Sequence, residues 1–263
     1  MNTKVKLGIV IGLYMLIMLA IGANWMHMIY VQDHIHLNKL IVKIFKPSTE
    51  NMLIQEKDIA RCVREFYKRD WKKIPIQGLN SALLESTLER MHVIHHAEVY
   101  VDAMENLHVD VYQRDPLFRV MESTGDQFYV DSEGKKIPAS MNYSARVPVV
   151  TGILQAWSGE DVWNKANTSY KIAFNVMKEI VKDPFINSLV EQVDMDSNGE
   201  LTFIPKIGFE KIQFGKAELI LEKLEKLKFF YKEGLRYEGW NVYQTLNLKV
   251  KDQVIGVKNL NKS

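Results

Sequence analysis

Three histidines within five residues form the densest group of side chains in the chain that could bind a metal. His92, His95 and His96 stand in the segment HVIHH, and imidazole nitrogen is a good ligand for zinc or copper. A structural zinc site usually needs four ligands, and neither a cysteine nor a well-placed acid lies near this segment. We therefore expect solvated histidines in the connection between a helix and a strand.

A second candidate is an acidic segment that imitates the start of a calcium-binding loop. Asp194, Asp196, Asn198 and Gly199 match the first positions of an EF-hand loop. Position twelve of that loop would be Pro205, where calcium needs a bidentate glutamate. A β-turn is the expected structure.

The remaining chemical candidates are also incomplete. Glu160 and Asp161 lie near Trp157, but adjacent residues point apart and no acid/base partner is identifiable, so we expect a loop or a helix cap. Ser158 lacks the GxSxG pattern of a nucleophile elbow, and neither GxGxxG nor GxxxxGKS occurs. Cys62 lies on an apolar helical stripe, where a thiol behaves as a small hydrophobe. The sequence predicts no catalytic residue, metal site or cofactor.

The composition describes a foldable chain with room for two domains. The 263 residues are 47% hydrophobic and 25% charged, which excludes wholesale disorder, and a domain takes about 150 residues. Lysine and arginine number 34 against 32 acidic residues, a net charge of +2. No strong field exists to hold a polyanion, so nucleic acid is disfavoured. A single cysteine cannot form an internal disulfide.

One segment near the N-terminus predicts a membrane anchor. No Asp, Glu, Lys or Arg occurs over residues 7–32, and about 20 apolar residues cross a bilayer. We expect a transmembrane helix over residues 7–31. Lys4 and Lys6 precede it, so the positive-inside rule keeps residues 1–6 in the cytoplasm and places the body in the periplasm or outside. The expected localisation is the cytoplasmic (inner) membrane, with a single pass.

A cleaved signal peptide is the alternative for this segment. Ala20, Ile21 and Gly22 satisfy a small-x-small cleavage pattern. The apolar run continues beyond Gly22, however, and exceeds the 7 to 15 residues or so of a signal core. The bulk of the chain is exported under either reading.

The first part of the exported body reads as a small α+β unit over residues 35–117. The expected elements are a strand over 37–45, a helix over 55–68, a helix capped by Asn80, and a hairpin of strands over 97–102 and 107–113. Two helices on one face of a three-stranded sheet would bury their apolar stripes.

A joint at Asp115-Pro116 introduces a larger mixed β domain over residues 118–263, with helices on one face of its sheet. Helices are expected over 169–182, where Pro184 stops the helix, and over 217–231, where Glu222 and Lys226 are spaced to pair. Alternation and turn chemistry predict strands over 118–121, 127–130, 136–138, 147–150, 189–195, 201–205, 211–214, 244–250 and 253–258. The fold class is therefore α+β.

Several short motifs, in this order, resemble the FtsQ/DivIB family of bacterial cell-division proteins. They are EVY at 98–100 with LHVDV at 107–111, QRDPL at 113–117, FYVD at 128–131 with Gly134, VPVVTG at 147–152, KIQFGK at 211–216, LNLKV at 246–250 and VIGVK at 254–258. The resemblance implies a short cytoplasmic tail, one membrane span, a POTRA domain over 35–117 and a β domain over 118–263.

The resemblance also implies the function of a divisome scaffold. Such a scaffold joins membrane-anchored partners of the FtsB and FtsL type and helps to control septal wall synthesis. It binds neither nucleic acid nor a small-molecule substrate. An alternative is a POTRA-containing export or outer-membrane assembly factor that acts as a protein-binding module. A wall hydrolase would need an acid/base pair or metal triad, and the sequence offers neither.

We expect partners to bind by strand addition at the C-terminal edge of the sheet. An unpaired edge offers a row of N–H and C=O groups to an incoming strand, and the last predicted strand is the candidate. The candidate partner-binding residues are Trp240, Tyr243, Gln253, Val254, Ile255, Gly256, Val257 and Lys258. Lysines on this strand could instead blunt the edge, and the two aromatic residues could instead belong to the core.

Overall fold

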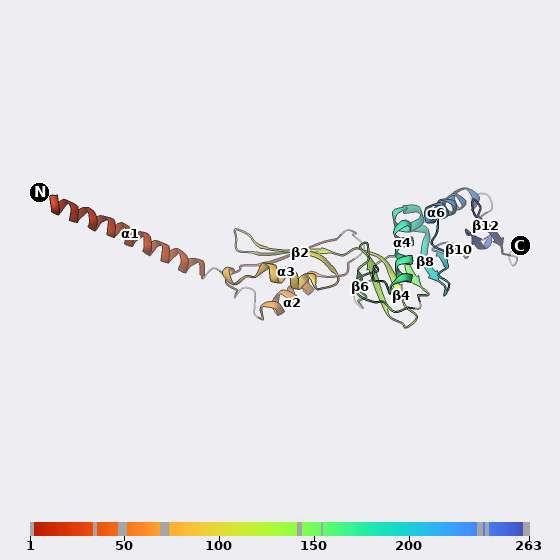
Figure 1. Cartoon of the computed structure of the whole chain (residues 1–263), viewed down its shortest axis with the longest axis horizontal. Helices are drawn as coiled ribbons and strands as arrows, with labels where there is room; N and C mark the ends of the chain where they lie inside the picture. Colours follow the sequence, from red (N-terminus) through yellow and green to blue (C-terminus); the bar gives the residue numbers. More distant parts are fainter. Residues whose placement is uncertain are drawn as a thin grey trace. The chain divides into compact units, whose positions relative to one another are not determined.

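The computed structural model describes residues 3–33, 36–46, 52–68, 74–140, 144–153, 155–235, 239 and 242–259. Its contacts divide the chain into two compact units (Figure 1). Unit 1 comprises Met1–Phe45 and Gln55–Tyr112, and unit 2 comprises Lys46–Ile54 and Gln113–Ser263. The mixed α+β class that the sequence predicts is confirmed.

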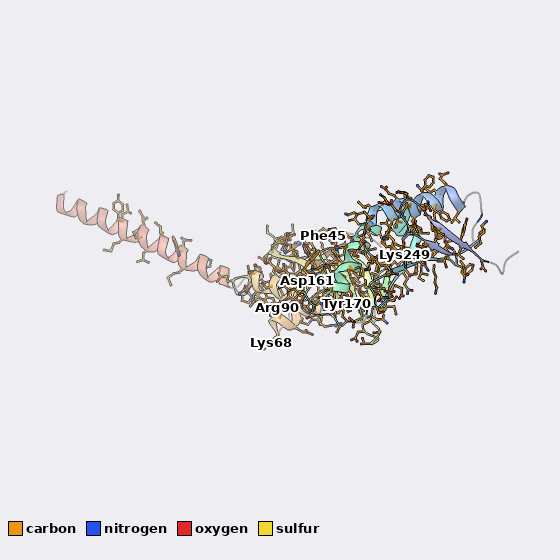
Figure 2. All side chains as sticks on the ribbon, turned by 45° about the vertical axis from the view of Figure 1, so that its right-hand side comes forward. Phe45, Lys68, Arg90, Asp161, Tyr170 and Lys249 are labelled. Carbon is orange, nitrogen blue, oxygen red and sulfur yellow. The ribbon has the colours of Figure 1, made fainter. Side chains whose placement is uncertain are left out.

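Unit 1 opens with the helix α1 (Thr3–Asp33). Many of its large apolar side chains, including Leu13, Leu19 and Met26, are highly exposed, and Figure 2 shows side chains on more than one side of this helix. Within the part of the chain that the structure describes, no helix combines the length and the apolarity needed to cross a membrane. The transmembrane segment predicted over residues 7–31 is therefore unconfirmed.

The rest of unit 1 is a three-stranded sheet with two helices. The elements are β1 (Leu40–Phe45), α2 (Glu56–Tyr67), the 3-10 turn η2 (Ile76–Gly78), α3 (Ser81–Glu89), β2 (Ile94–Val101) and β3 (Leu107–Gln113). The strand order is β1-β3-β2, with β1 parallel to β3. This is the predicted arrangement of strand, two helices and hairpin.

Local signals explain the elements of unit 1. The Asn80 side chain accepts a hydrogen bond from the Leu83 N–H and caps α3 as predicted. At the hairpin, one oxygen of Asp102 accepts from the N–H groups of Met104 and Asn106 at 2.8 and 2.9 Å. These bonds close the turn, because an aspartate side chain readily satisfies the backbone ahead of it.

Unit 2 is a nine-stranded sheet with three helices. In chain order the elements are β4 (Pro116–Met121), β5 (Gln127–Asp131), β6 (Lys136–Pro138), β7 (Val149–Thr151), α4 (Thr168–Lys182), α5 (Pro184–Leu189), β8 (Val190–Met195), β9 (Leu201–Pro205), β10 (Lys211–Gly215), α6 (Ile220–Phe229), the π-helical turn η3 (Phe230–Gly234), β11 (Tyr243–Asn247) and β12 (Ile255–Lys258). The strand order is β12-β11-β10-β9-β8-β7-β4-β5-β6.

One continuous core joins α4, α5 and α6 to the sheet of unit 2. Phe174, Met177 and Leu227 of the helices are buried in the same cluster as Val193 and Phe203 of the central strands. The alternate residues of β8, such as Gln192, are partly exposed. Side chains alternate along a strand, so one face of the sheet carries the core. The helices therefore cover that face, as the sequence predicts.

The segment after α4 differs from the prediction. Pro184 does not merely end α4, because it is the first residue of a further short helix, α5. The Asp183 side chain caps α5 by accepting from the N–H groups of Phe185 and Ile186 at 2.9 and 3.3 Å. Proline suits a first helical position, where its missing N–H costs nothing.

Candidate functional site

The sheet of unit 2 ends in two edge strands, β6 and β12, and an edge is where another chain can pair. Figure 1 shows the two strands at opposite ends of the unit. Their surroundings in the described part of the chain differ, and this difference defines the candidate site.

The edge at β6 is covered by a loop from a distant part of the sequence. Lys135 and Asp161 form an antiparallel bridge. The Val162 N–H donates to the Gly134 carbonyl at 2.9 Å, and the Lys136 N–H donates to the Glu160 carbonyl at 3.4 Å. The strand itself ends in Pro138, which lacks an N–H. This edge is already occupied.

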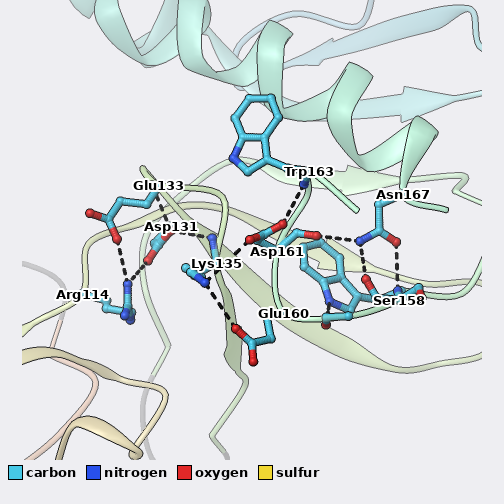
Figure 3. A network of polar contacts seen from close by, with 11 residues as sticks. Arg114, Asp131, Glu133, Lys135, Ser158, Glu160, Asp161, Trp163 and Asn167 are labelled. Carbon is cyan, nitrogen blue, oxygen red and sulfur yellow. Dashed lines mark hydrogen bonds and ion pairs between the residues drawn. The ribbon is translucent and has the colours of Figure 1, made fainter. Parts of the chain in front are cut away.

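Asn167 holds the covering loop in place (Figure 3). Its side chain is fully buried. The amide nitrogen donates to the carbonyl oxygens of Ser158 and Asp161 at 2.7 and 2.8 Å, and the amide oxygen accepts from the Ser158 N–H at 2.9 Å. Three bonds from one buried amide fix the loop, because breaking any of them would strand a buried polar group.

Two of the motifs that carry the family resemblance, QRDPL at 113–117 and FYVD at 128–131, meet beside this loop. Arg114 donates to Asp131 at 2.8 Å and to Glu133 at 3.1 Å (Figure 3). The other oxygen of Asp131 accepts from the N–H groups of Glu133 and Lys135 at 2.9 and 2.7 Å. The buried Asp131 thus shapes the turn between β5 and β6, and the pair has a structural role.

No loop is seen over the opposite edge, β12, among the residues that the structure describes. In the described chain, β12 pairs with β11 alone. Ile255 and Val257 are 44% and 54% exposed. Because N–H groups alternate along a strand and the Asn259 N–H donates to the Val242 carbonyl, the N–H of Gly256 points away from β11. An edge strand with exposed apolar side chains is one that another strand can extend.

Helix α6 and the turn after it hold the hairpin of β11 and β12 against the core. The Lys226 ammonium donates to the carbonyl oxygens of Val250 and Leu248 at 2.7 and 3.5 Å. The sequence predicts that Lys226 pairs with Glu222, but its ammonium makes these two bonds instead. Four residues later, the Phe230 ring lies edge-on to Tyr243 at 5.4 Å. Residues i and i+4 share one helix face, so both reach the same hairpin.

The neighbouring Lys223 of α6 is almost completely buried. Its ammonium donates to the Lys216 carbonyl at 2.8 Å and lies 4.8 Å from the centre of the Phe214 ring. Burial lowers the pKa of Lys223 from its ordinary value. The residue joins α6 to β10 and does not face the open edge strand.

The predicted partner-binding residues fall into three groups. Ile255, Gly256, Val257 and Lys258 form β12, and Gln253 and Val254 stand in the connection before it. Tyr243 begins β11, half-buried, with its ring over Gly256 and against Phe230. Trp240 lies outside the described residues. The sequence does not predict the contacts of Asn167, Lys226 and Phe230, because no local pattern marks an amide, ammonium or ring that reaches a distant segment.

The histidine segment contributes to unit 1. The sequence predicts solvated histidines in a connection, but His95 and His96 belong to β2, and the Nδ1 atom of His96 lies 2.7 Å from a carboxylate oxygen of Glu89. The Nε2 atom lies 3.6 Å from Glu98. Among the described residues, no group of three or more histidines, cysteines and acids could hold a metal ion.

The other chemical candidates have clear local roles. Asp196 accepts from the N–H groups of Asn198 and Glu200 at 2.9 and 2.8 Å, which makes the predicted β-turn. Asp194 accepts from the Thr151 hydroxyl at 2.5 Å. Cys62 is partly buried on α2, and burial, followed by the charge of Glu65, raises the pKa of its thiol.

The fold is therefore that of a mixed α+β protein whose main sheet is covered by a loop at β6 and, among the described residues, pairs only with β11 at β12. The family model described as FtsQ/DivIB, C-terminal related, matches residues 115–257, more than half of the chain. The chain therefore belongs to this family of FtsQ/DivIB-related proteins. Membership indicates a role in cell division, with other division proteins as partners. A search of curated proteins finds no match to the chain.

Proposed function

We propose that this protein is a membrane-anchored scaffold of the division machinery that binds partners by strand addition at β12 and helps to control septal wall synthesis. The proposed role is binding rather than catalysis. The observation that carries the proposal is the contrast between the two sheet edges. The loop around Asp161 covers β6, whereas β12 pairs with β11 alone in the described chain.

The geometry of β12 suits such a partner. A strand that pairs with the outer side of β12 would take up the backbone groups of Gly256, which point away from β11. Its alternate side chains would lie beside Ile255 and Val257 on one face. Main-chain bonds would supply affinity, and the two exposed apolar side chains would favour apolar residues on the partner.

Membership of the FtsQ/DivIB-related family supports partners from the division machinery. Within that group we propose membrane-anchored proteins of the FtsB and FtsL type. The motifs LNLKV at 246–250 and VIGVK at 254–258, which carry part of the resemblance to FtsQ/DivIB, suggest such partners. We also propose that unit 1 is a POTRA domain, since its strand, two helices and hairpin match the arrangement that the resemblance implies.

We further propose that α1 anchors the protein in the cytoplasmic membrane, with the body outside. Support comes from the uncharged run over residues 7–32, which lies within one helix of 31 residues. Extraction of cell membranes with alkaline carbonate tests the anchor. The full chain should stay in the membrane pellet, and its release into the supernatant would contradict the anchor.

The binding experiment uses the purified full chain in detergent micelles and the extracytoplasmic segments of FtsB- and FtsL-type proteins from the same cell. The double variant Ile255→Lys/Val257→Lys places charges on the edge strand without removing a ladder hydrogen bond. We expect it to bind at least tenfold more weakly, roughly 1.4 kcal/mol.

The variant Ile207→Lys adds one lysine at another exposed apolar position and controls for a general effect of added charge. Ile207 is 66% exposed and lies in the connection between β9 and β10. It should bind as the wild type does, and circular dichroism should show that both variants are folded. If the wild-type chain binds neither segment, or if the β12 variant binds as well as Ile207→Lys, the proposed function is wrong.

A further inference from the structure

A single row of paired residues crosses the sheet of unit 2 and ends at Gly256. From β4 to β12 the row contains Val120, Val150, Val193, Phe203, Ile212, Leu246 and Gly256. All members before Gly256 are buried apolar residues of the core that faces the helices. At the edge strand, the row therefore lacks a side chain in the position where the preceding strands supply one.

The ring of Tyr243 takes that position. A Cβ atom on Gly256 would collide with the Cδ1 and Cε1 atoms of Tyr243. The φ angle of Gly256 lies outside the left-handed region, so backbone conformation does not require glycine here. The absent side chain is what the site requires, because an aromatic ring from the neighbouring strand lies on the glycine, an arrangement known to stabilise edge glycines.

A second glycine makes room for the ring behind Tyr243. Phe230 lies edge-on to Tyr243 at 5.4 Å. A Cβ on Gly234, the last residue of the π-helical turn, would lie only 3.1 Å from the Cδ2 atom of Phe230. Gly234 also has no left-handed φ. Two aromatic rings between two glycines thus connect the turn after α6 to the edge strand.

The turn has a second anchor that fixes its orientation. Tyr231, next to Phe230, is buried and donates a hydrogen bond to the carboxylate of Glu210. Glu210 is itself buried and belongs to the segment before β10. Because Tyr231 is held by this bond, Phe230 is directed toward the hairpin.

We infer that Tyr243, seated on Gly256 and braced by Phe230, is a positioning residue that keeps the edge strand β12 paired with β11 and ready for a partner. Tyr243 thus acts through β12 and does not anchor the partner itself. The inference rests on the proposed function for the role of β12. Whether β12 stays paired with β11 can, however, be measured in the protein without any partner.

The first measurement is amide hydrogen exchange of residues 254–259 in the free full chain in detergent micelles. Replacement of Tyr243 by alanine should speed exchange at the amides of Ile255 and Val257, which point toward β11, by about tenfold or more. Tyr243→Phe keeps the ring and should exchange as the wild type does. If Tyr243→Ala leaves these amides unchanged, the inference is wrong.

A double variant tests whether Tyr243 and Gly256 act as one unit. Gly256→Ala should also speed exchange, because its methyl group displaces the ring. In Tyr243→Ala/Gly256→Ala the methyl group has free space, so exchange should be no faster than in Tyr243→Ala. Additive effects of the two substitutions would show that the Tyr243 ring and Gly256 do not act through their mutual contact. Leu221→Ala, at an exposed position of α6, should leave exchange unchanged.

Binding then separates the two proposals. With the FtsB-type segment, Tyr243→Ala should bind at least tenfold more weakly and Tyr243→Phe should bind normally. If Tyr243 contacted the partner directly, Tyr243→Ala would weaken binding without changing hydrogen exchange in the free protein. That result would overturn the positioning role. If the wild-type chain does not bind the segment, the proposed function fails, and the exchange data still decide the role of Tyr243.

Discussion

The side-chain amide of Asn167 donates to the carbonyl oxygen of Asp161 at 2.8 Å, and Asp161 is the residue that bridges to the β6 edge. A buried residue at the start of α4 thus fixes the loop that closes one end of the nine-stranded sheet.

Asn167→Ala should destabilise the protein by about 3 kcal/mol, because two carbonyl groups and one N–H in part-buried positions lose their partner. Urea denaturation of the full chain measures the change. Lys165→Ala, an exposed position in the same loop, should stay within about 0.5 kcal/mol of the wild type. Equal stability of the two variants would contradict the role of Asn167.

The hydrogen bond from Tyr231 to Glu210 predicts a second stability difference. Tyr231→Phe leaves a buried carboxylate without this donor and should cost roughly 1–3 kcal/mol. Tyr243→Phe is the matched control, since no hydrogen bond of its hydroxyl occurs among the described residues. If denaturation midpoints of both variants equal that of the wild type, the Tyr231 bond contributes nothing to stability.

Two tyrosines should resist ionisation in the folded protein. Burial, and next the hydrogen bonds to Glu122 and Glu210, raise the pKa of Tyr170 and of Tyr231 above the ordinary value. Since these pKa values are raised on folding, the stabilisation is complete below about pH 10 and falls as the pH rises above that value.

Absorbance at 295 nm during an alkaline titration checks this expectation. In the wild type, part of the rise in absorbance from phenolate formation should come late in the titration, when the protein unfolds and Tyr170 and Tyr231 become exposed. Tyr170→Phe/Tyr231→Phe should show less of this late phase. A titration of all tyrosines near pH 10 in the folded protein would contradict the prediction.

The pair between Asp183 and Lys228 predicts a dependence of stability on acid pH. The hydrogen bond from Lys228 at 2.6 Å, and next the N–H groups at the start of α5, lower the pKa of Asp183. A lowered pKa means that the stabilisation is present above about pH 4 and is lost as the pH falls through the folded-state pKa.

Asp183→Ala should cost roughly 1 kcal/mol at pH 7, the usual value of a lost helix cap. Lys228→Met keeps the cap and should cost less. Thermal unfolding between pH 2 and 7 measures both, and the difference from the wild type should shrink below pH 4. A constant difference across this range would show that the charge of Asp183 is irrelevant.

Cys62 should be a slow nucleophile. Burial, and next the carboxylate of Glu65, raise the pKa of its thiol, so little thiolate forms near neutral pH. Reaction with a disulfide reagent at pH 7.5 should be slower in the native chain than in the chain unfolded by urea, and Glu65→Gln should speed the native reaction. Equal rates in the native and unfolded chains would contradict the prediction.

Much of the fold could be predicted from local sequence signals. The helix caps at Asn80 and the turns at Asp102 and Asp196 arise from residues within four positions of one another. Apolar periodicity located α2, α4 and α6, and the edge strand β12 lies within the predicted last strand. Pro184 was harder to interpret, since proline can both follow one helix and begin another.

The sequence alone determined most of the element types, the hairpins and the family resemblance, because periodicity, caps and turn chemistry act over a few residues. Only the tertiary structure decided that a loop covers β6, that β12 pairs with β11 alone among the described residues, and which residues hold these two edges. Asp161 reaches Lys135, Lys226 reaches Val250, and Phe230 reaches Tyr243. These contacts join residues 13 to 26 positions apart, and their partners depend on strand order and tertiary packing, which no local pattern specifies.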